Sequence, residues 1–286
     1  MAPGLRRVVA ENPSKFTAWG TGTYIVGDGR VAIIDPGPDL DEHVAALLAA
    51  VEGETVTHVL ITHTHADHSP AAAAIVAATG ATTYGYGPHP VEPLDPDAAG
   101  QPDPARSDAE EHGDLAFRPD VVVRHGDVVH VGDQELECVF TPGHISNHVC
   151  WSWRDAGALF SGDHVMGWST SVISPPEGRV TDYLDSLRLL LARDETVYYP
   201  THGPPITSPH EHVRALLEHR LERERQIVAL LGDGPRTVAE LVAIMYADVR
   251  PELHEPAGRS VTAHLIALID AGRVVGPDDA DRYRVR

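Results

Sequence analysis

The residues His63-Thr64-His65-Ala66-Asp67-His68 place four potential metal ligands within six positions. They follow an apolar stretch, residues 58–61, that is typical of a buried strand. On a loop that leaves a strand, side chains two positions apart can converge while adjacent ones diverge, and first-row metals accept imidazole and carboxylate ligands. One ion cannot easily use all four side chains. The stretch therefore predicts a metal site where a strand ends.

On either side of this stretch, segments whose apolar residues recur at every second position alternate with segments whose apolar residues recur about every 3.6 positions. Two similar rounds of strands and helices predict an α/β fold in which two sheets pack together with helices outside. The first two strands are joined at Gly27-Asp28-Gly29, which is a hairpin signal. The predicted strands lie in residues 23–26, 31–34, 58–61, 121–140, 149–160 and 196–200, and the predicted helices in residues 40–51, 71–78 and 183–192.

The segment from residue 88 to residue 119 is rich in proline and acidic residues and poor in aliphatic ones. That composition is typical of a long surface loop. Loops of this length in compact domains are usually functional or disordered, so we expect a partly ordered flap beside a site.

From residue 211 onward the pattern changes to helices followed by a hairpin. A long charged helix over residues 211–231 precedes amphipathic helices over 237–246 and 260–271 and short strands over 273–275 and 283–285. Residues 1–210 contain 11 Lys and Arg against 29 Asp and Glu, whereas residues 211–286 contain 11 against 13. Element order and charge together predict two domains, residues 1–210 and a small winged-helix domain of residues 211–286.

The 286-residue chain has 22 Lys and Arg against 42 Asp and Glu, a formal net charge of −20. That balance argues against a protein that grips nucleic acid mainly through released counterions, and it suits a bound divalent metal. Cys138 and Cys150 lie in apolar stretches, which favours reduced core thiols over a disulfide. We see no signal peptide and no run of 18 apolar residues, so we expect a cytoplasmic protein without a membrane partner.

The hexapeptide resembles the HxHxDH motif of the metallo-beta-lactamase superfamily, and three further superfamily motifs follow in order. They are Thr141-Pro142-Gly143-His144, Phe160-Ser161-Gly162-Asp163 and Pro200-Thr201-His202-Gly203. The resemblance implies a four-layer αββα sandwich that holds two metal ions, zinc by ligand type, while iron or manganese suit the same ligands. It implies that one ion is held by His63, His65 and His144 and the other by Asp67, His68 and His202, with Asp163 bridging both.

Five imidazoles and two carboxylates around two divalent ions leave positive charge, which stabilises a bridging hydroxide as a nucleophile at neutral pH. The expected reaction is therefore metal-assisted hydrolysis. True beta-lactamases lack a bridging carboxylate at the position of Asp163. Its presence resembles the thioesterases, lactonases, phosphodiesterases and ribonucleases of the superfamily and disfavours antibiotic hydrolysis.

Further residues are expected to support the ligands. We predict that Asp67 and His164 are the catalytic residues, with His164 contacting substrate or supporting the ligand shell. Asp35 resembles the strand-end Asp that supports the metal loop, and His148 is expected to order a loop more than to bind metal. The other histidines, such as His89, His112, His125 and His130, are expected on the surface.

Parts of the tail resemble the winged-helix extension of the beta-lactamase-like protein 2 group, some members of which are endoribonucleases that cleave single-stranded RNA. The matching segments are residues 219–220, 223–227, 237–241, 260–265 and 272–274. A single-strand binder needs a basic groove with aromatic platforms, whereas residues 1–210 are strongly acidic. Arg220, Arg223 and Arg225 stand at helical spacing beside acidic residues, which indicates a self-paired solvated face more than an RNA groove.

Three functions remain open. We favour a dinuclear metal hydrolase of an ester-type bond (thioester, lactone or phosphoester) in a small molecule, with Trp168, Ser169 and Thr170 and the flap shaping its pocket. The first alternative is an endoribonuclease acting on single-stranded RNA. The second is a DNA-binding regulator that uses the winged helix, with the metal domain as sensor, although the tail has no basic recognition helix.

Overall fold

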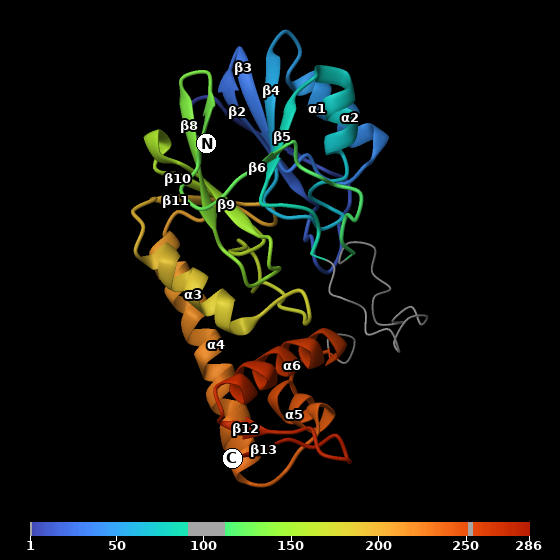
Figure 1. The fold of residues 1–286 in the computed structure, drawn as a ribbon, viewed down its shortest axis with the longest axis vertical. Helices are drawn as coiled ribbons and strands as arrows, with labels where there is room; N and C mark the ends of the chain where they lie inside the picture. Colours follow the sequence, from blue (N-terminus) through green and yellow to red (C-terminus); the bar gives the residue numbers. More distant parts are fainter. Residues whose placement is uncertain (1, 91–111, 251–253) are drawn as a thin grey trace. The chain divides into compact units, whose positions relative to one another are not determined.

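The computed structural model describes residues 2–90, 112–250 and 254–286, which fall into two compact units (Figure 1). The sheet unit consists of Met1–Thr141, Asn147–Thr170 and Asp194–Pro209. The helical unit consists of Pro142–Ser146, Ser171–Arg193 and His210–Arg286. Two segments that precede residue 210 thus group with the helical unit, and the domains of residues 1–210 and 211–286 stay a prediction.

One sheet of the sheet unit has six strands in chain order. They are β1 (Leu5–Val9), β2 (Gly22–Asp28), β3 (Arg30–Ile34), β4 (Thr55–Leu60), β5 (Thr82–Gly85) and β6 (Val121–Val122), with helices α1 (Asp41–Ala50) and α2 (Ala72–Thr79) between strands. The hairpin predicted at residues 27–29 is confirmed, since Asp28 pairs with Arg30 in the antiparallel β2–β3 pair. From β3 onward the strands are parallel, because α1 and α2 return the chain to the starting edge.

The other sheet has the order β11-β10-β9-β8-β7. Its strands are β7 (Val128–Val131), β8 (Gln134–Phe140), β9 (Val149–Trp153), β10 (Ala158–Gly162) and β11 (Val197–Pro200). The predicted antiparallel pattern over residues 121–140 and 149–160 is confirmed for β7 to β10. The pair β10–β11 is parallel, so both strands end at the same edge of the sheet.

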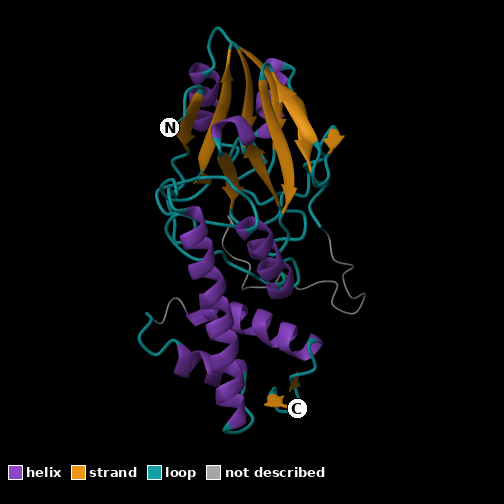
Figure 2. Cartoon of the chain, turned by 90° about the vertical axis from the view of Figure 1, so that its left-hand side faces the viewer, coloured by secondary structure: helices purple, strands orange, loops and turns teal. Residues whose placement is uncertain are grey.

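The core of the sheet unit lies between the two sheets, which pack face to face (Figure 2). Because side chains alternate along a strand, Tyr24 and Ile25 of β2 face opposite sides. Tyr24 belongs to the cluster that contains Trp151 of β9, whereas Ile25 belongs to the cluster that contains Leu47 of α1. The central strands β2 and β3 of this sheet are thus buried on both faces, as their nearly continuous apolar residues predict.

The helical unit contains four helices and a small hairpin in its described part. They are α3 (Val180–Leu191), α4 (Pro209–Gly232), α5 (Val238–Met245), α6 (His254–Asp270), β12 (Val274–Val275) and β13 (Arg284–Val285). A capping box of Thr237 and Glu240 starts α5. Apolar faces of α4, α5 and α6 bury Ile227, Leu241 and Leu265 in one cluster. The order of helices followed by a hairpin, predicted from the sequence, is confirmed.

The structure differs from the sequence predictions in several elements. Strands β1 and β5 were not predicted, and α6 begins at His254, six positions before the predicted start. Strand β1 was not predicted because Arg6 and Arg7 make its sequence polar. In the structure Arg7 donates hydrogen bonds to the carbonyl oxygens of Thr201 and Gly203 at 2.9 and 2.8 Å. Most of the predicted flap, residues 91–111, lies outside the described residues.

Two smaller expectations concern the cysteines and the membrane. Cys138 and Cys150 are both buried and form no disulfide, as predicted. Within the described ranges, no helix combines the length and the apolar character needed to cross a bilayer.

Candidate metal centre

Loops at the ends of four strands carry the predicted ligands. The hexapeptide begins three positions after the end of β4, Asp163 follows β10, His202 follows β11, and His144 lies in the connection from β8 to β9. Because β10 and β11 are parallel and end at one edge, Oδ1 of Asp163 lies 3.3 Å from Nε2 of His202. Gly162 has φ +50°, and a Cβ there would meet Nε2 of His148 at 2.6 Å, so only glycine allows this approach.

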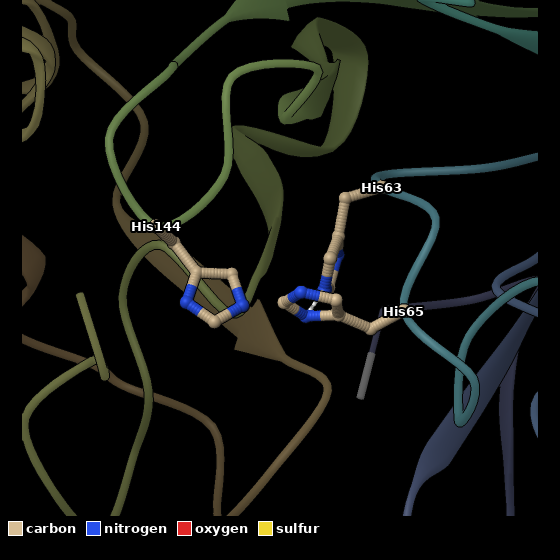
Figure 3. Close-up of side chains that lie close together, drawn as sticks. All are labelled: His63, His65 and His144. Carbon is tan, nitrogen blue, oxygen red and sulfur yellow. Dashed lines mark hydrogen bonds between the residues drawn. The ribbon is translucent and has the colours of Figure 1, made fainter. Parts of the chain in front are cut away.

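The seven predicted ligands form three groups whose potential ligand atoms lie within 4.8 Å of one another. Figure 3 shows the ring of His144 facing those of His63 and His65. Asp163 groups with one member of each predicted triplet, which suits a bridging carboxylate. All seven side chains belong to residues that are at most 8% exposed. The groups are His63, His65 and His144; His63, His68 and Asp163; and Asp67, His68 and His202.

Burial and charge oppose each other in setting the protonation of this cluster. Burial lowers the pKa of His202, but Asp163 and Asp67 outweigh it and raise that pKa to about 10. Burial also lowers the pKa of His68, and Asp67, Asp163 and Asp35 bring it well above its usual range. Burial raises the pKa of Asp163, yet His202 and His68 hold it well below its usual range. Protonated rings thus offset the carboxylates, and a cation can replace those protons.

Hydrogen bonds fix the orientation of three imidazoles. Nδ1 of His68 donates to Oδ2 of Asp35 at 2.9 Å, and Nδ1 of His202 donates to the carbonyl of Gly20 at 3.4 Å. Nδ1 of His144 donates to the carbonyl of Val172 at 2.6 Å. In each ring the orienting hydrogen bond is made by Nδ1, so Nε2 is the nitrogen that could bind a metal, which is how metal-binding histidines are usually arranged.

The donor set fits divalent metal. Nε2 of His68 is buried and makes no hydrogen bond within the described part of the chain, although oxygens of Asp67 and Asp163 lie 3.4 and 3.5 Å away. A buried polar atom without a partner costs free energy and marks a site that another group completes. Imidazole nitrogens beside carboxylate oxygens are the mixed donor set that zinc, iron and manganese accept.

The predicted supporting residues have distinct environments. Asp35 accepts hydrogen bonds from the backbone nitrogen and Oγ1 of Thr62 at 2.7 and 2.6 Å, as well as from His68. His148 orders a loop as expected, because its Nδ1 lies 2.9 Å from Oγ1 of Thr141 and its Nε2 accepts from the backbone nitrogen of Asp163. His164 is completely buried, with its ring centroid 5.7 Å from that of His148.

The expectation that His89 lies on the surface is wrong. His89 is 6% exposed, and its Nδ1 lies 2.9 Å from Oγ1 of Thr64, inside the hexapeptide. His112, His125 and His130 are exposed, as expected.

The sequence predictions also missed two groups beside the ligands. Oγ1 of Thr21 donates to Oδ2 of Asp67 at 2.9 Å, and the carbonyl of Val172 orients His144. Thr21 stands in a run of small residues that resembles any strand entry. A backbone carbonyl gives no residue-type signal at all.

The prediction of a solvated arginine face on α4 is partly wrong. Arg225 pairs with Glu222 at 2.9 Å on an exposed face, as predicted. Arg220 is only 3% exposed, and Arg223 lies over the ring of Tyr246 at 5.4 Å. Residues that share helical spacing therefore face different surroundings.

Known proteins resemble most of this chain. An atrochrysone carboxyl ACP thioesterase of Aspergillus chevalieri is 29% identical over 269 residues, which cover 90% of this chain and 78% of the relative. The metallo-beta-lactamase family protein TTHA1429 from Thermus thermophilus matches with a TM-score of 0.79 at 24% identity, covering 100% of this chain and 99% of that one. TTHA1623, solved in a di-iron-bound form, matches 72% of this chain and 96% of its own at 26% identity, with a TM-score of 0.54.

Two family profiles divide the chain in the predicted order. The Beta-lactamase associated winged helix domain matches residues 237–282, which confirms the predicted winged helix. The Metallo-beta-lactamase superfamily profile matches residues 20–202, a span that contains all seven predicted ligands. The chain therefore belongs to the metallo-beta-lactamase superfamily and is a hydrolase of that superfamily.

Proposed function

We propose that this protein hydrolyses a thioester in an acyl group carried on a pantetheine arm, at a site of two divalent metal ions. Hydrolysis adds water across the C–S bond and yields a carboxylic acid and a thiol. The observation that carries the proposal is the closeness of the three ligand groups, with Asp163 beside His63 and His68, in a chain similar to an ACP thioesterase. Among the ester-type bonds considered from the sequence, the thioester is the one that the relatives favour.

The metal part of the proposal rests on the donor set. His63, His65 and His144 would hold one ion, Asp67, His68 and His202 the other, and Asp163 both. When bound, the ions would acidify a water molecule and polarise the thioester carbonyl. Zinc is proposed from the ligand types, with iron or manganese as alternatives; TTHA1623, a structural neighbour, was solved with two irons.

Hydrogen bonds from side chains and backbone carbonyls of the protein would hold this site rigid. Asp35 fixes the tautomer of His68, and the carbonyls of Val172 and Gly20 do so for His144 and His202. Thr21 holds Asp67, which we propose as a catalytic residue through its place between His68 and His202.

We propose a different role for His164. Its complete burial favours support of the loop that carries Asp163 over contact with the substrate.

The RNA alternative gains no support from the described arginines of α4. Arg220 is buried, and Arg225 is paired with Glu222. The formal charge of −20 also opposes a polyanionic substrate. The DNA-binding regulator shares the winged helix with this chain, but the formal charge of −20 opposes that polyanionic partner as well.

The test is hydrolysis of a substrate panel by the metal-loaded protein. Acyl-pantetheine and acyl-N-acetylcysteamine thioesters, a lactone, a phosphodiester and single-stranded RNA would be compared, and thiol release would be measured with a chromogenic disulfide. Both cysteines of the chain are buried, so the native protein adds little background. We expect thioester cleavage that chelation abolishes and metal restores. Preferred cleavage of RNA or a phosphodiester would overturn the proposal.

The matched histidine controls are His202→Ala and His130→Ala. His202 lies in a ligand group, whereas His130 is exposed on β7. We expect the first variant to lose activity and the second to keep it.

A further inference from the structure

The loop that carries His144 rests on helix α3. Gly143 has φ +141°, and a Cβ there would lie 2.3 Å from Cα of Tyr183. The backbone nitrogen of Arg179 donates to the carbonyl of Gly143 at 2.9 Å, and Oγ of Ser186 donates to the carbonyl of Pro142 at 2.7 Å. The backbone of the loop is therefore fixed at its first residues, whereas these contacts do not involve the His144 ring.

A backbone carbonyl group contributes to the orientation of that ring. Nδ1 of His144 donates to the carbonyl of Val172 at 2.6 Å. Val172 lies in a segment, residues 170–174, that belongs to no helix or strand. No helix or strand ladder holds this peptide, and its carbonyl also accepts a hydrogen bond from Oγ of Ser171 at 3.4 Å, so its place depends on how Ser171 is held.

Arg220 of α4 holds Ser171 in place. Its guanidinium donates to the carbonyl of Ser171, the residue before Val172. The guanidinium carbon lies 5.3 Å from the centre of the Tyr183 ring, and a second nitrogen donates to Oγ of Ser260 at 3.3 Å. Arg220 thus binds the 170–174 segment and also contacts the helix on which the His144 loop rests.

The burial of Arg220 is difficult to explain by stability alone. Arg220 is 3% exposed, and within the described ranges no carboxylate pairs with it and its Nε has no hydrogen-bond partner. His264, also from the helical unit, is 1% exposed nearby, and Arg223 adds a like charge. A buried charge without an opposite charge costs free energy, and an apolar residue of similar size is often as stable or more so.

We propose that Arg220 is a positioning residue for the metal ligand His144. By holding the carbonyl of Ser171, it fixes the next peptide, so that the Val172 carbonyl takes the Nδ1 proton and Nε2 is kept for metal. The inference rests on the proposed metal site. It gives a residue of the C-terminal helices a role in one half of that site, which neither family profile nor any relative's name assigns.

The test measures metal binding by the purified full-length chain in the variants Arg220→Met and Arg223→Met. Arg223 is the matched control, because it lies on the same helix and stacks on Tyr246 instead. We expect Arg220→Met to weaken zinc binding at one of two positions by about 10- to 100-fold, as loss of a supporting contact does. Arg223→Met should keep both affinities. Competition with a chromophoric chelator gives the affinities, and the visible spectrum of the cobalt-loaded protein reports the changed ligand geometry.

A comparison with His144→Ala identifies which position is affected. The Arg220→Met and His144→Ala changes should weaken the same position, and the double variant should lose no more than His144→Ala alone, because both act through one ring. Arg220→Lys keeps the charge but lacks the planar fork, so its affinity should lie between those of the parent and Arg220→Met.

Three outcomes would overturn the inference. They are parental affinity at both positions in a folded variant that lacks the guanidinium, additive losses in the double variant, and unfolding of both Arg220→Met and Arg220→Lys, which would show a purely structural role. A parent protein that binds two ions but cleaves no thioester contradicts the proposed function alone. A thioesterase parent with unaltered metal binding in Arg220→Met contradicts this inference alone.

Discussion

Nδ1 of His68 lies 2.9 Å from Oδ2 of Asp35, a carboxylate 33 positions earlier in the chain. The same carboxylate accepts two hydrogen bonds from Thr62, and Oγ1 of Thr201 lies 3.3 Å from it. Asp35 therefore connects the strand ends that precede the hexapeptide and His202. Its φ of +48° is a left-handed conformation that Asp and Asn tolerate better than most residues.

Replacing Asp35 with Asn should weaken one half of the metal site. The amide keeps the size and the backbone conformation but removes the charge that fixes the His68 tautomer. We expect metal affinity at the position of Asp67, His68 and His202 to fall about 10- to 100-fold. Loss of the charged acceptor should also lower the free energy of unfolding by about 1–3 kcal/mol. Chelator competition and denaturant unfolding measure the two effects.

Asp120 offers a matched control for that variant. Asp120 accepts hydrogen bonds from the backbone nitrogen and Oγ1 of Thr83, but it is exposed and lies outside the ligand groups. Asp120→Asn should change stability without changing metal affinity. Equal metal affinity in Asp35→Asn and the parent would contradict the supporting role of Asp35.

The changes Asp67→Ala and His202→Ala should each empty one metal position. Oδ2 of Asp67 lies 3.2 Å from Nε2 of His202, and both residues are buried in one ligand group. We expect one ion in place of two by elemental analysis, and turnover lower by orders of magnitude, while circular dichroism stays that of the parent. Full metal content together with a normal rate in either variant would refute the ligand assignment.

The hexapeptide stands out in the sequence because its chemistry is local. Asp163 and His202 were proposed as ligands through the superfamily motifs that they share, and the structure brings their side chains close to those of the hexapeptide. The hairpin at residues 27–29 is equally local, since a turn with glycine at both ends specifies it.

Tertiary packing explains what the sequence did not predict. Arg220, Arg223 and Arg225 share one helix and one spacing, yet only packing decides that Arg220 is buried and Arg225 is not. His89 is buried because it binds Thr64 across 25 positions, a contact that no local pattern contains. The carbonyl of Val172 is a backbone group, so its role depends entirely on where the fold places it.

Two exposed tryptophans, Trp19 and Trp168, are expected to contact the acyl substrate. Trp19 is 72% exposed and Trp168 is 41% exposed. The residue after Trp19, Gly20, accepts from Nδ1 of His202, and the residue before Trp168, Gly167, donates to the His202 carbonyl at 3.0 Å. Exposed aromatic side chains beside a site commonly provide apolar contact area for a ligand.

The variants Trp19→Ala and Trp168→Ala should raise KM for an aromatic acyl thioester by about 2- to 10-fold each, which corresponds to the loss of one aromatic contact. Turnover should change little, because neither side chain belongs to a ligand group. Ile244→Ala, at an exposed apolar residue of α5, is the control and should leave KM unchanged. A fall in turnover at constant KM would instead show that the tryptophans support the catalytic groups.

Replacing His264 with Leu should make the protein less sensitive to acid. His264 is 1% exposed with no hydrogen bond to either ring nitrogen in the described structure, and burial, aided by Arg220, His219 and Arg223, lowers its pKa to about 3. The unfolded chain takes up a proton near pH 6.5, whereas the folded chain does not. The folded state should therefore lose up to about 1.4 kcal/mol per pH unit as the pH falls from about 6 toward 4.

Denaturant unfolding of the parent and of His264→Leu between pH 4 and pH 8 tests this linkage. Below pH 6 the free energy of unfolding should depend less steeply on pH in the variant than in the parent, by the contribution of about one proton. At pH 7 the variant should be at least as stable as the parent, because no buried hydrogen bond is removed. The control His130→Leu, at an exposed histidine of β7, should keep the parental slope. An unchanged slope in His264→Leu would mean that the folded protein accommodates the charged ring, and that Arg220 and Arg223 do not suppress its protonation.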